Sequence, residues 1–268
     1  MCYQEGDKKL NSELQRIISW AIDNEIPDLV STNEGYWSGL PRDYDKLRSL
    51  DSLRIKCENL TCLPPEIGCL TSLKELHVFS KSLASLPSEI GQLKQLDTLC
   101  LIGGELTSLP DELCQLTNLK KLELSGNRFA EIPNQIFKLK GLAELRVAGC
   151  GLRHIPEEIG QLKNLIWLDL RNNKLTEIPE VIFELSGLNF LLLGSNRLTS
   201  LSTSVGELES LMWLDLIKNN LKTLPSEIHR LQNLVTLSLK GNRFTCLPEG
   251  VFVLPNLDDK TREQLETL

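Results

Sequence analysis

Residues that could do chemistry recur at a fixed spacing in the first half of the chain. His77, Cys100 and Glu123 follow one another at intervals of 23 residues. A histidine within hydrogen-bond reach of a cysteine can hold it as a nucleophilic thiolate. A thiol enzyme that uses Cys100 and His77 is therefore one hypothesis for function. The eight cysteines lack the short paired spacing of zinc ligands, so we expect no metal site and no cofactor.

A second set of residues at the same spacing is aromatic. Trp167, Phe190 and Trp213 would form one row if equivalent residues lie on neighbouring strands, roughly 4.8 Å apart. Exposed aromatic side chains with a charged fringe are typical of protein-binding hot spots. Aromatic packing that only stiffens a sheet, or burial of the row by a terminal segment, is the alternative. The candidate partner-binding residues are this aromatic row and its flanks: Trp167, Phe190, Trp213, Asp169, Leu192, Asp215, Arg171 and Ile217.

Both sets depend on a repeat of 23 residues. Nine consecutive repeats begin at leucines from Leu50 to Leu234, and each reads L-x-x-L-x-L with Ile or Val at some third positions. The ninth position is Asn or Cys in six of the nine repeats, and Glu58, Lys81 and Gly104 replace it in the first three. This is the leucine-rich repeat pattern, and it requires stacking because one repeat cannot cover its own apolar face.

Each repeat predicts a strand followed by a short helical turn. The strand buries its leucines, and the asparagine binds backbone groups where the chain turns away. The second half reads L-P-x-x-I-[GF]-x-L, in which proline opens a helical turn and acidic residues follow at its positive end. Ser202 replaces one such proline and leaves that turn's geometry open. The predicted fold class is an α/β leucine-rich repeat solenoid (horseshoe), with a parallel β-sheet on the concave face, short helices or 3₁₀ turns on the convex face, and an N-terminal helical cap.

The ends of the repeat array need covers. Residues 1–26 are predicted to form an N-terminal helical cap, with a helix from Ser12 to about Glu25, because Ser12 and Gln15 match a capping box. Residues 27–49 form a degenerate first repeat, residues 50–256 the nine 23-residue repeats, and residues 257–268 a C-terminal cap. We expect residues 254–257 to begin a tenth strand. The apolar residues assigned to the two caps are Leu14, Ile17, Ile18, Ala21 and Ile22, and Leu265 and Leu268.

The run Leu-Pro-x-Glu-Ile-Gly-x-Leu in a 23-residue frame resembles the intracellular class of leucine-rich repeats. That class includes Ras-pathway scaffold proteins, plant Ras-group repeat proteins and many bacterial proteins. The resemblance covers residues 40–257. It implies a curved solenoid that binds other proteins, and it names no partner.

Composition narrows the function classes. The net charge of −7 disfavours nucleic acid as a partner, because such binding comes largely from Lys and Arg. No apolar stretch approaches the roughly 20 residues of a membrane span, and the scattered cysteines fit a reducing compartment. We therefore predict a non-enzymatic, monomeric, cytoplasmic protein-interaction module or scaffold, with a protein partner on its concave sheet, no nucleic acid and no membrane. Secretion without a cleavable signal stays open, so a microbial secreted or translocated effector that binds a host protein is a further hypothesis.

Overall fold

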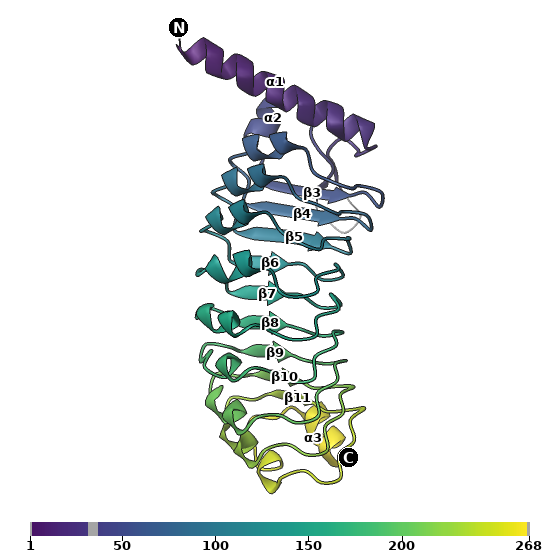
Figure 1. Cartoon of the computed structure of the whole chain (residues 1–268), viewed down its shortest axis with the longest axis vertical. Coiled ribbons are helices and arrows are strands. Elements are labelled where there is room, and N and C mark those ends of the chain that lie inside the picture. Colours follow the sequence, from purple (N-terminus) through teal and green to yellow (C-terminus); the bar gives the residue numbers. More distant parts are fainter. Residues whose placement is uncertain (1, 32–36, 267–268) are drawn as a thin grey trace. The chain divides into compact units, whose positions relative to one another are not determined.

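The computed structural model describes residues 2–31 and 37–266 of the chain (Figure 1). The chain divides into two compact units, Met1–Arg128 and Phe129–Leu268. We call them the N-terminal unit and the C-terminal unit. Each is built largely from the same strand and 3₁₀ helix pair, so each is described in turn.

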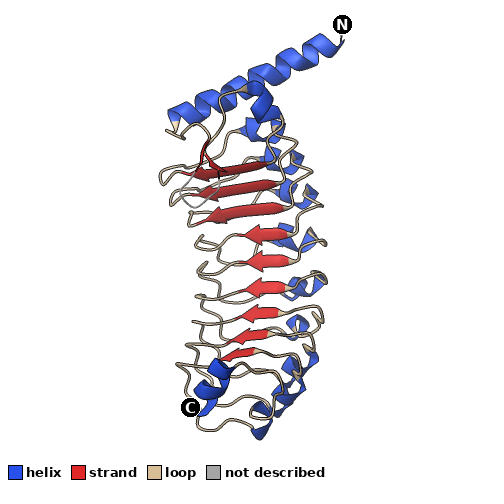
Figure 2. Ribbon diagram, turned by 180° about the vertical axis from the view of Figure 1, so that it is seen from behind, coloured by secondary structure: helices blue, strands red, loops and turns tan. Residues whose placement is uncertain are grey.

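The N-terminal unit starts with helical and antiparallel elements and continues as a parallel sheet. Its four parallel strands pair in the order β3-β4-β5-β6. Its 3₁₀ helices lie along one side of the strands (Figure 2). The elements are α1 (Cys2–Asp23), β1 (Val30–Ser31), β2 (Trp37–Ser38), α2 (Tyr44–Arg48), β3 (Ser52–Lys56), η1 (Pro65–Cys69), β4 (Glu75–Phe79), η2 (Ser88–Gln92), β5 (Thr98–Ile102), η3 (Asp111–Gln115) and β6 (Lys121–Glu123).

The C-terminal unit repeats the same alternation and ends in a helix. Its five parallel strands pair in chain order from β7 to β11. The elements are η4 (Asn134–Lys138), β7 (Glu144–Arg146), η5 (Glu157–Gln161), β8 (Trp167–Asp169), η6 (Glu180–Ile182), β9 (Phe190–Leu192), η7 (Thr203–Glu207), β10 (Trp213–Asp215), η8 (Ser226–Arg230), β11 (Thr236–Ser238), η9 (Glu249–Val251) and α3 (Asp259–Glu266).

Columns of leucine form the core of each unit. On β4, Leu76 and Val78 are fully buried, while the side chain of His77 between them lies on the opposite face of the sheet. Leu76 pairs in register with Leu53 on one side and with Leu99 on the other. A constant repeat length therefore places every leucine against its equivalent. The predicted leucine-rich repeat fold class is confirmed.

The asparagine at the ninth position holds the chain where it leaves the strand. Asn196 is buried, and its Nδ2 donates hydrogen bonds to Leu170 O (3.0 Å) and Leu193 O (2.9 Å). Its Oδ1 accepts a hydrogen bond from Leu175 N (3.1 Å). Equivalent contacts, shifted by whole repeats, recur at Asn127, Asn173, Asn219 and Asn242.

The first three repeats lack this asparagine and differ locally from the later ones. The Oγ of buried Ser80 donates to Leu60 O (2.8 Å) and accepts from Ser82 N (3.1 Å). At Gly104, a Cβ atom would lie 2.8 Å from Asn127 Oδ1, so only glycine fits against the next repeat's asparagine. Strands β3, β4 and β5 of these repeats have five residues each, against three in β6 to β11.

The 3₁₀ helices follow the predicted proline, and the serine exception keeps their geometry. Pro225 precedes η8 with φ −65° and ψ 149°. Ser202 precedes η7 with φ −64° and ψ 150°, and its Oγ accepts a hydrogen bond from Ser204 N (3.1 Å). The hydroxyl thus satisfies a backbone N–H at the start of the turn and holds the conformation that the proline ring fixes elsewhere.

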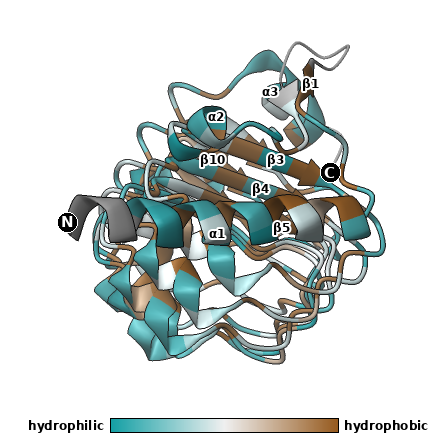
Figure 3. Ribbon diagram, turned by 90° about the horizontal axis from the view of Figure 1, so that it is seen from above, coloured by the Kyte–Doolittle hydropathy of each residue, from teal (hydrophilic) through white to brown (hydrophobic). Residues whose placement is uncertain are grey.

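Helix α1 is longer than its sequence signals predict. It begins at Cys2, so the predicted start at Ser12 and its capping box are wrong. The helix runs on through Ser12, and half of residues 2–11 are good helix formers: Gln4, Glu5, Lys8, Lys9 and Leu10. Leu14, Ile17, Ile18 and Ala21 are buried as predicted, but Ile22 is 59% exposed because it lies about 100° further round the helix than Ala21. Figure 3 shows α1 from above with its hydropathy. None of the described helices is long and apolar enough to span a bilayer.

Residues 27–49 depart from the later repeats. β1 and β2 pair antiparallel, and α2 is an α-helix where the repeats have a 3₁₀ turn. Gly39 (φ +105°) donates its N–H to Arg54 O (2.9 Å), which covers part of the free edge of β3. A Cβ atom at Gly39 would lie 2.5 Å from Asp28 O, so this contact requires glycine. Leu40 and Leu47 are fully buried.

Helix α3 lies against the last strand, β11. Gln264 Nε2 donates to Leu237 O (3.3 Å), and Thr261 Oγ1 accepts from Leu237 N (3.3 Å). These side chains occupy the hydrogen-bonding groups that another strand would use. The tenth strand predicted at residues 254–257 does not form, because the chain turns there and enters α3. Leu265 is buried, and Leu268 lies outside the described residues.

Candidate protein-binding site

The aromatic row forms at the predicted positions in the C-terminal unit. Trp167 on β8 pairs in register with Phe190 on β9, and Phe190 pairs with Trp213 on β10. The rings of Trp167 and Phe190 stack with centroids 4.4 Å apart and an interplanar angle of 25°. Trp213 is 38% exposed. The row therefore combines a rigid stacked pair with one more accessible indole.

The charged flank at β8 is engaged within the chain. Asp169 is buried, and its carboxylate accepts hydrogen bonds from Arg171 Nη2 (2.6 Å), Nε (3.0 Å) and backbone N (3.1 Å). The arginine side chain remains 43% exposed. Asp169 thus orients Arg171, and the guanidinium is the member of the pair that a partner would meet.

On β10, the carboxylate beside the row belongs to Asp215, and it makes no ion pair with a basic side chain of the described chain. Asp215 is 8% exposed, and its Oδ1 accepts a hydrogen bond from Ile217 N (2.9 Å). Burial raises the pKa of Asp215 above the ordinary aspartate value, although its hydrogen bond from Ile217 and the charge of Arg171 oppose the shift. A Cβ atom at Gly194 would lie 2.7 Å from Asp215 Oδ2, so glycine leaves room for the carboxylate. Leu192 is buried.

Sequence reasoning missed three residues beside the row. The guanidinium of Arg146 lies 4.7 Å from the centroid of the Trp167 ring, and Arg146 also forms an ion pair with Glu144. Ile166 and Met212, which precede the two tryptophans, are exposed. Their positions in the repeat could have revealed them. Arg146 stands one repeat before Asp169, and Ile166 and Met212 occupy the same position of their repeats.

The second predicted cluster also comes together, in the N-terminal unit. His77, Cys100 and Glu123 are register partners on β4, β5 and β6. Burial lowers the pKa of His77, and the charge of Arg54 adds to this effect, while Glu75, with Oε2 3.6 Å from His77 Nε2, opposes it.

Cys100 and Glu123 are both buried, and Glu123 Oε1 accepts a hydrogen bond from Ser125 N (2.9 Å). A substrate therefore has little access to the sulfur. Within the described part of the chain, no group of three or more His, Cys, Asp or Glu side chains is arranged to hold a metal ion.

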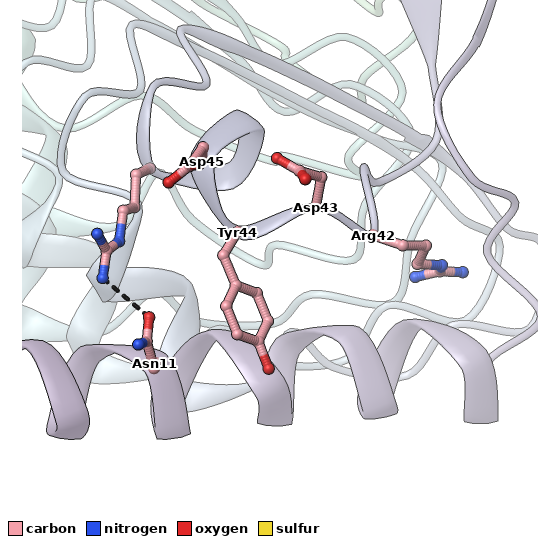
Figure 4. A pocket seen from close by; sticks show the side chains of 6 residues that line it. Asn11, Arg42, Asp43, Tyr44 and Asp45 are labelled. Atoms are coloured by element: carbon pink, nitrogen blue, oxygen red, sulfur yellow. Dashed lines mark hydrogen bonds between the residues drawn. The ribbon is translucent and has the colours of Figure 1, made fainter.

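A polar hollow of about 450 Å³ lies between α1 and α2 in the N-terminal unit (Figure 4). Arg48 Nη2 donates to Asn11 Oδ1 (2.8 Å), which ties the two helices together. Asp43 Oδ1 accepts from Lys46 N (2.9 Å) and caps α2. These side chains have structural partners, and the hollow contains neither predicted set.

Comparison with known families decides the class of the protein. Models described as leucine-rich repeat match residues 118–139, 140–198 and 186–244. This is a leucine-rich repeat protein. The matches cover both units in part, and they do not distinguish the 23-residue intracellular class, which stays a prediction.

Solved structures of other leucine-rich repeat proteins are similar to this one. A protein of Leptospira interrogans is 34% identical over 85% of this chain and 61% of its own, with a TM-score of 0.65. The plant peptide hormone receptor RGFR1, in complex with RGF2, is 31% identical over 81% of this chain and 36% of its own, with a TM-score of 0.66. An internalin of Listeria monocytogenes (23% identical, TM-score 0.65, covering 79% and 61%) shares the fold. This leucine-rich repeat protein thus spans less than two thirds of each. No curated protein sequence matches it.

Proposed function

We propose that this leucine-rich repeat protein is a non-enzymatic interaction module whose protein partner docks on the aromatic row. The observation that carries the proposal is the in-register placement of Trp167, Phe190 and Trp213 on three adjacent strands. The core does not use these side chains, because the leucines of the same strands fill it from the opposite face. Large aromatic side chains in that setting are typical binding anchors.

The row is prepared for binding before a partner arrives. Trp167 is held between the Arg146 guanidinium at 4.7 Å and the Phe190 ring at 4.4 Å. Little side-chain freedom is lost when such groups are covered, so more of the contact energy appears as affinity.

A structural relative supports a protein or peptide as the class of ligand. The similar plant receptor RGFR1 was solved in complex with RGF2. The proposal for the present chain is limited to the class of ligand, because the two chains share only part of their length. Which protein is bound follows from the experiment below.

The test begins with affinity capture from the native cell lysate and continues with titration calorimetry of the captured protein. Trp213→Ala is expected to weaken binding by at least about 2 kcal/mol, as loss of a large aromatic anchor does. Phe252→Ala is the matched control, because Phe252 is also an exposed aromatic residue of the C-terminal unit but lies outside the row. Equal affinity of Trp213→Ala and the wild type would overturn the placement.

The predicted location, the monomeric state and the thiol-enzyme hypothesis each have a separate test. A cytoplasmic location is checked by cell fractionation, and recovery of the protein outside the producing cell would favour the effector hypothesis instead. The monomeric state is checked by light scattering. For the thiol-enzyme hypothesis, we expect Cys100 to react no faster than a free thiol in a labelling assay, because it is buried.

A further inference from the structure

The triplet Trp-Leu-Asp occurs on two strands of the C-terminal unit, β8 and β10. On β8, both polar contacts of the triplet are made by arginines of this chain. The Arg146 guanidinium lies 4.7 Å from the Trp167 ring centroid, and Arg171 Nη2 lies 2.6 Å from Asp169 Oδ2. On β8 the tryptophan ring and the aspartate carboxylate of this triplet therefore each contact an arginine guanidinium.

On β10, the equivalent positions are apolar. Leu192 stands one repeat before Asp215, where β8 has Arg146, and Ile217 stands where β8 has Arg171. Trp213 is correspondingly accessible, at 38% exposure. Among the residues that the structure describes, no Lys, Arg or His nitrogen lies within 4.0 Å of the Asp215 carboxylate. The same tryptophan and aspartate thus lie on β10 without the two arginines, the tryptophan exposed and the aspartate buried.

Asp215 is held in place for a contact of this kind. Its Oδ1 is fixed by the Ile217 N–H, while Oδ2 lies over Gly194, where a Cβ atom would be only 2.7 Å away. The charge of Arg171 acts on Asp215, but its guanidinium is bound to Asp169. A carboxylate that is more than nine-tenths buried and lacks a counterion gains most from an added cation.

We propose that the partner places a lysine or arginine side chain between the Trp213 ring and the Asp215 carboxylate. The cation would make a cation–π contact with the indole and donate a charge-assisted hydrogen bond to Oδ2. The net charge of −7 favours the approach of a basic segment. This inference rests on the proposed function and specifies it: the partner segment is basic as well as apolar.

The test uses a random-peptide display library, panned separately on the wild type, Asp215→Asn and Trp213→Ala. Asparagine keeps an oxygen to accept the Ile217 N–H, and it removes both the charge and the Oδ2 acceptor, which becomes an N–H donor. Peptides selected on the wild type are expected to carry Lys or Arg beside an apolar residue, and Asp215→Asn is expected to weaken them by on the order of tenfold or more. Asp259→Asn makes the same charge change at an exposed position outside the row, and it is expected to bind like the wild type.

A second measurement keeps the protein unchanged. Replacement of the peptide's basic residue by norleucine is expected to lower affinity for the wild type by a similar factor, which covers the case in which Asp215→Asn does not fold. Selected peptides that lose binding to Trp213→Ala, but carry no basic residue and bind Asp215→Asn as tightly as wild type, would overturn this inference and leave the proposed function intact. Peptides that ignore Trp213→Ala as well would overturn both.

Discussion

Replacement of Asn196 by alanine measures how much the asparagine ladder contributes to the repeat. Asn196 makes four hydrogen bonds with buried backbone groups, of which the one to Gly194 O is the longest, at 3.5 Å. Leu170 O also accepts from Asn173 Nδ2 (2.9 Å), and Leu193 O also accepts from Asn219 Nδ2 (3.0 Å). These two carbonyls therefore keep one side-chain donor each in the variant. The N–H that bonds to Asn196 Oδ1 loses its acceptor altogether.

The expected loss of stability depends on which backbone groups keep another hydrogen-bond partner when Asn196 is removed. An orphaned buried N–H costs about 1–3 kcal/mol, and each weakened carbonyl adds about 0.5 kcal/mol. Asn196→Ala is thus expected to lower the free energy of unfolding by about 2–4 kcal/mol. Asn164→Ala is the matched control, because Asn164 is exposed and makes one hydrogen bond, to Lys140 O (2.7 Å), for which water can substitute. We expect it to cost less than about 1 kcal/mol.

Urea denaturation followed by circular dichroism gives both values, and hydrogen exchange locates the effect. The amide of Leu175, which donates to Asn196 Oδ1, is expected to exchange faster in Asn196→Ala and unchanged in Asn164→Ala. If the two variants unfold within about 0.5 kcal/mol of each other, or if Leu175 stays protected, the assignment of stability to the ladder is refuted.

Three further outcomes follow from the structure. Gln264→Ala is expected to destabilise the protein by about 1–2 kcal/mol, measured by urea denaturation, because Gln264 hydrogen-bonds Leu237 O on the last strand; an unchanged midpoint would show that α3 does not cap β11. Exposed Cys62 is expected to react with a thiol reagent at pH 8 much faster than Cys69, because burial and Glu13 raise the pKa of Cys69 to about 12; mass spectrometry of the labelled protein decides, and equal rates would contradict it. Burial raises the pKa of Asp215 in the folded state, so its stability penalty appears as pH rises through that pKa and is absent at lower pH. Asp215→Asn is therefore expected to be more stable than wild type at pH 7, with the gain shrinking toward about pH 4; a gain independent of pH would exclude this explanation.

Much of the fold was predictable because the repeat length is constant. Once residues 23 apart share a column, alternation along the strand determines which side chains face the core and which share the other face. That reasoning placed Trp167, Phe190 and Trp213 in one row, and the register confirms the placement. The extent of α1 was less predictable, because Ser12 matches a local capping signal although the helix runs through it from Cys2.

Contacts between columns were not predictable from the repeat. Arg146 has Glu144 and the Trp167 ring within reach, and only its rotamer decides that it contacts both. The burial of Asp169 likewise depends on Arg171 folding back over it. The repeat pattern places side chains on a face, but their pairing on that face follows from three-dimensional packing.

The acidic residues between the strand leucines share one local structural role, and at Asp215 that role does not explain the charge. Glu123, Asp169 and Asp215 each accept a hydrogen bond from the backbone N–H two residues later, at 2.9, 3.1 and 2.9 Å. This bond holds the end of the strand, and a neutral asparagine or glutamine oxygen could make it equally well. The local role therefore does not explain why the charge is kept at Asp215, where burial disfavours it and no basic side chain of the described chain pairs with it. At Asp169 the charge serves to hold Arg171, whereas at Asp215 a cation supplied from outside the chain accounts for it.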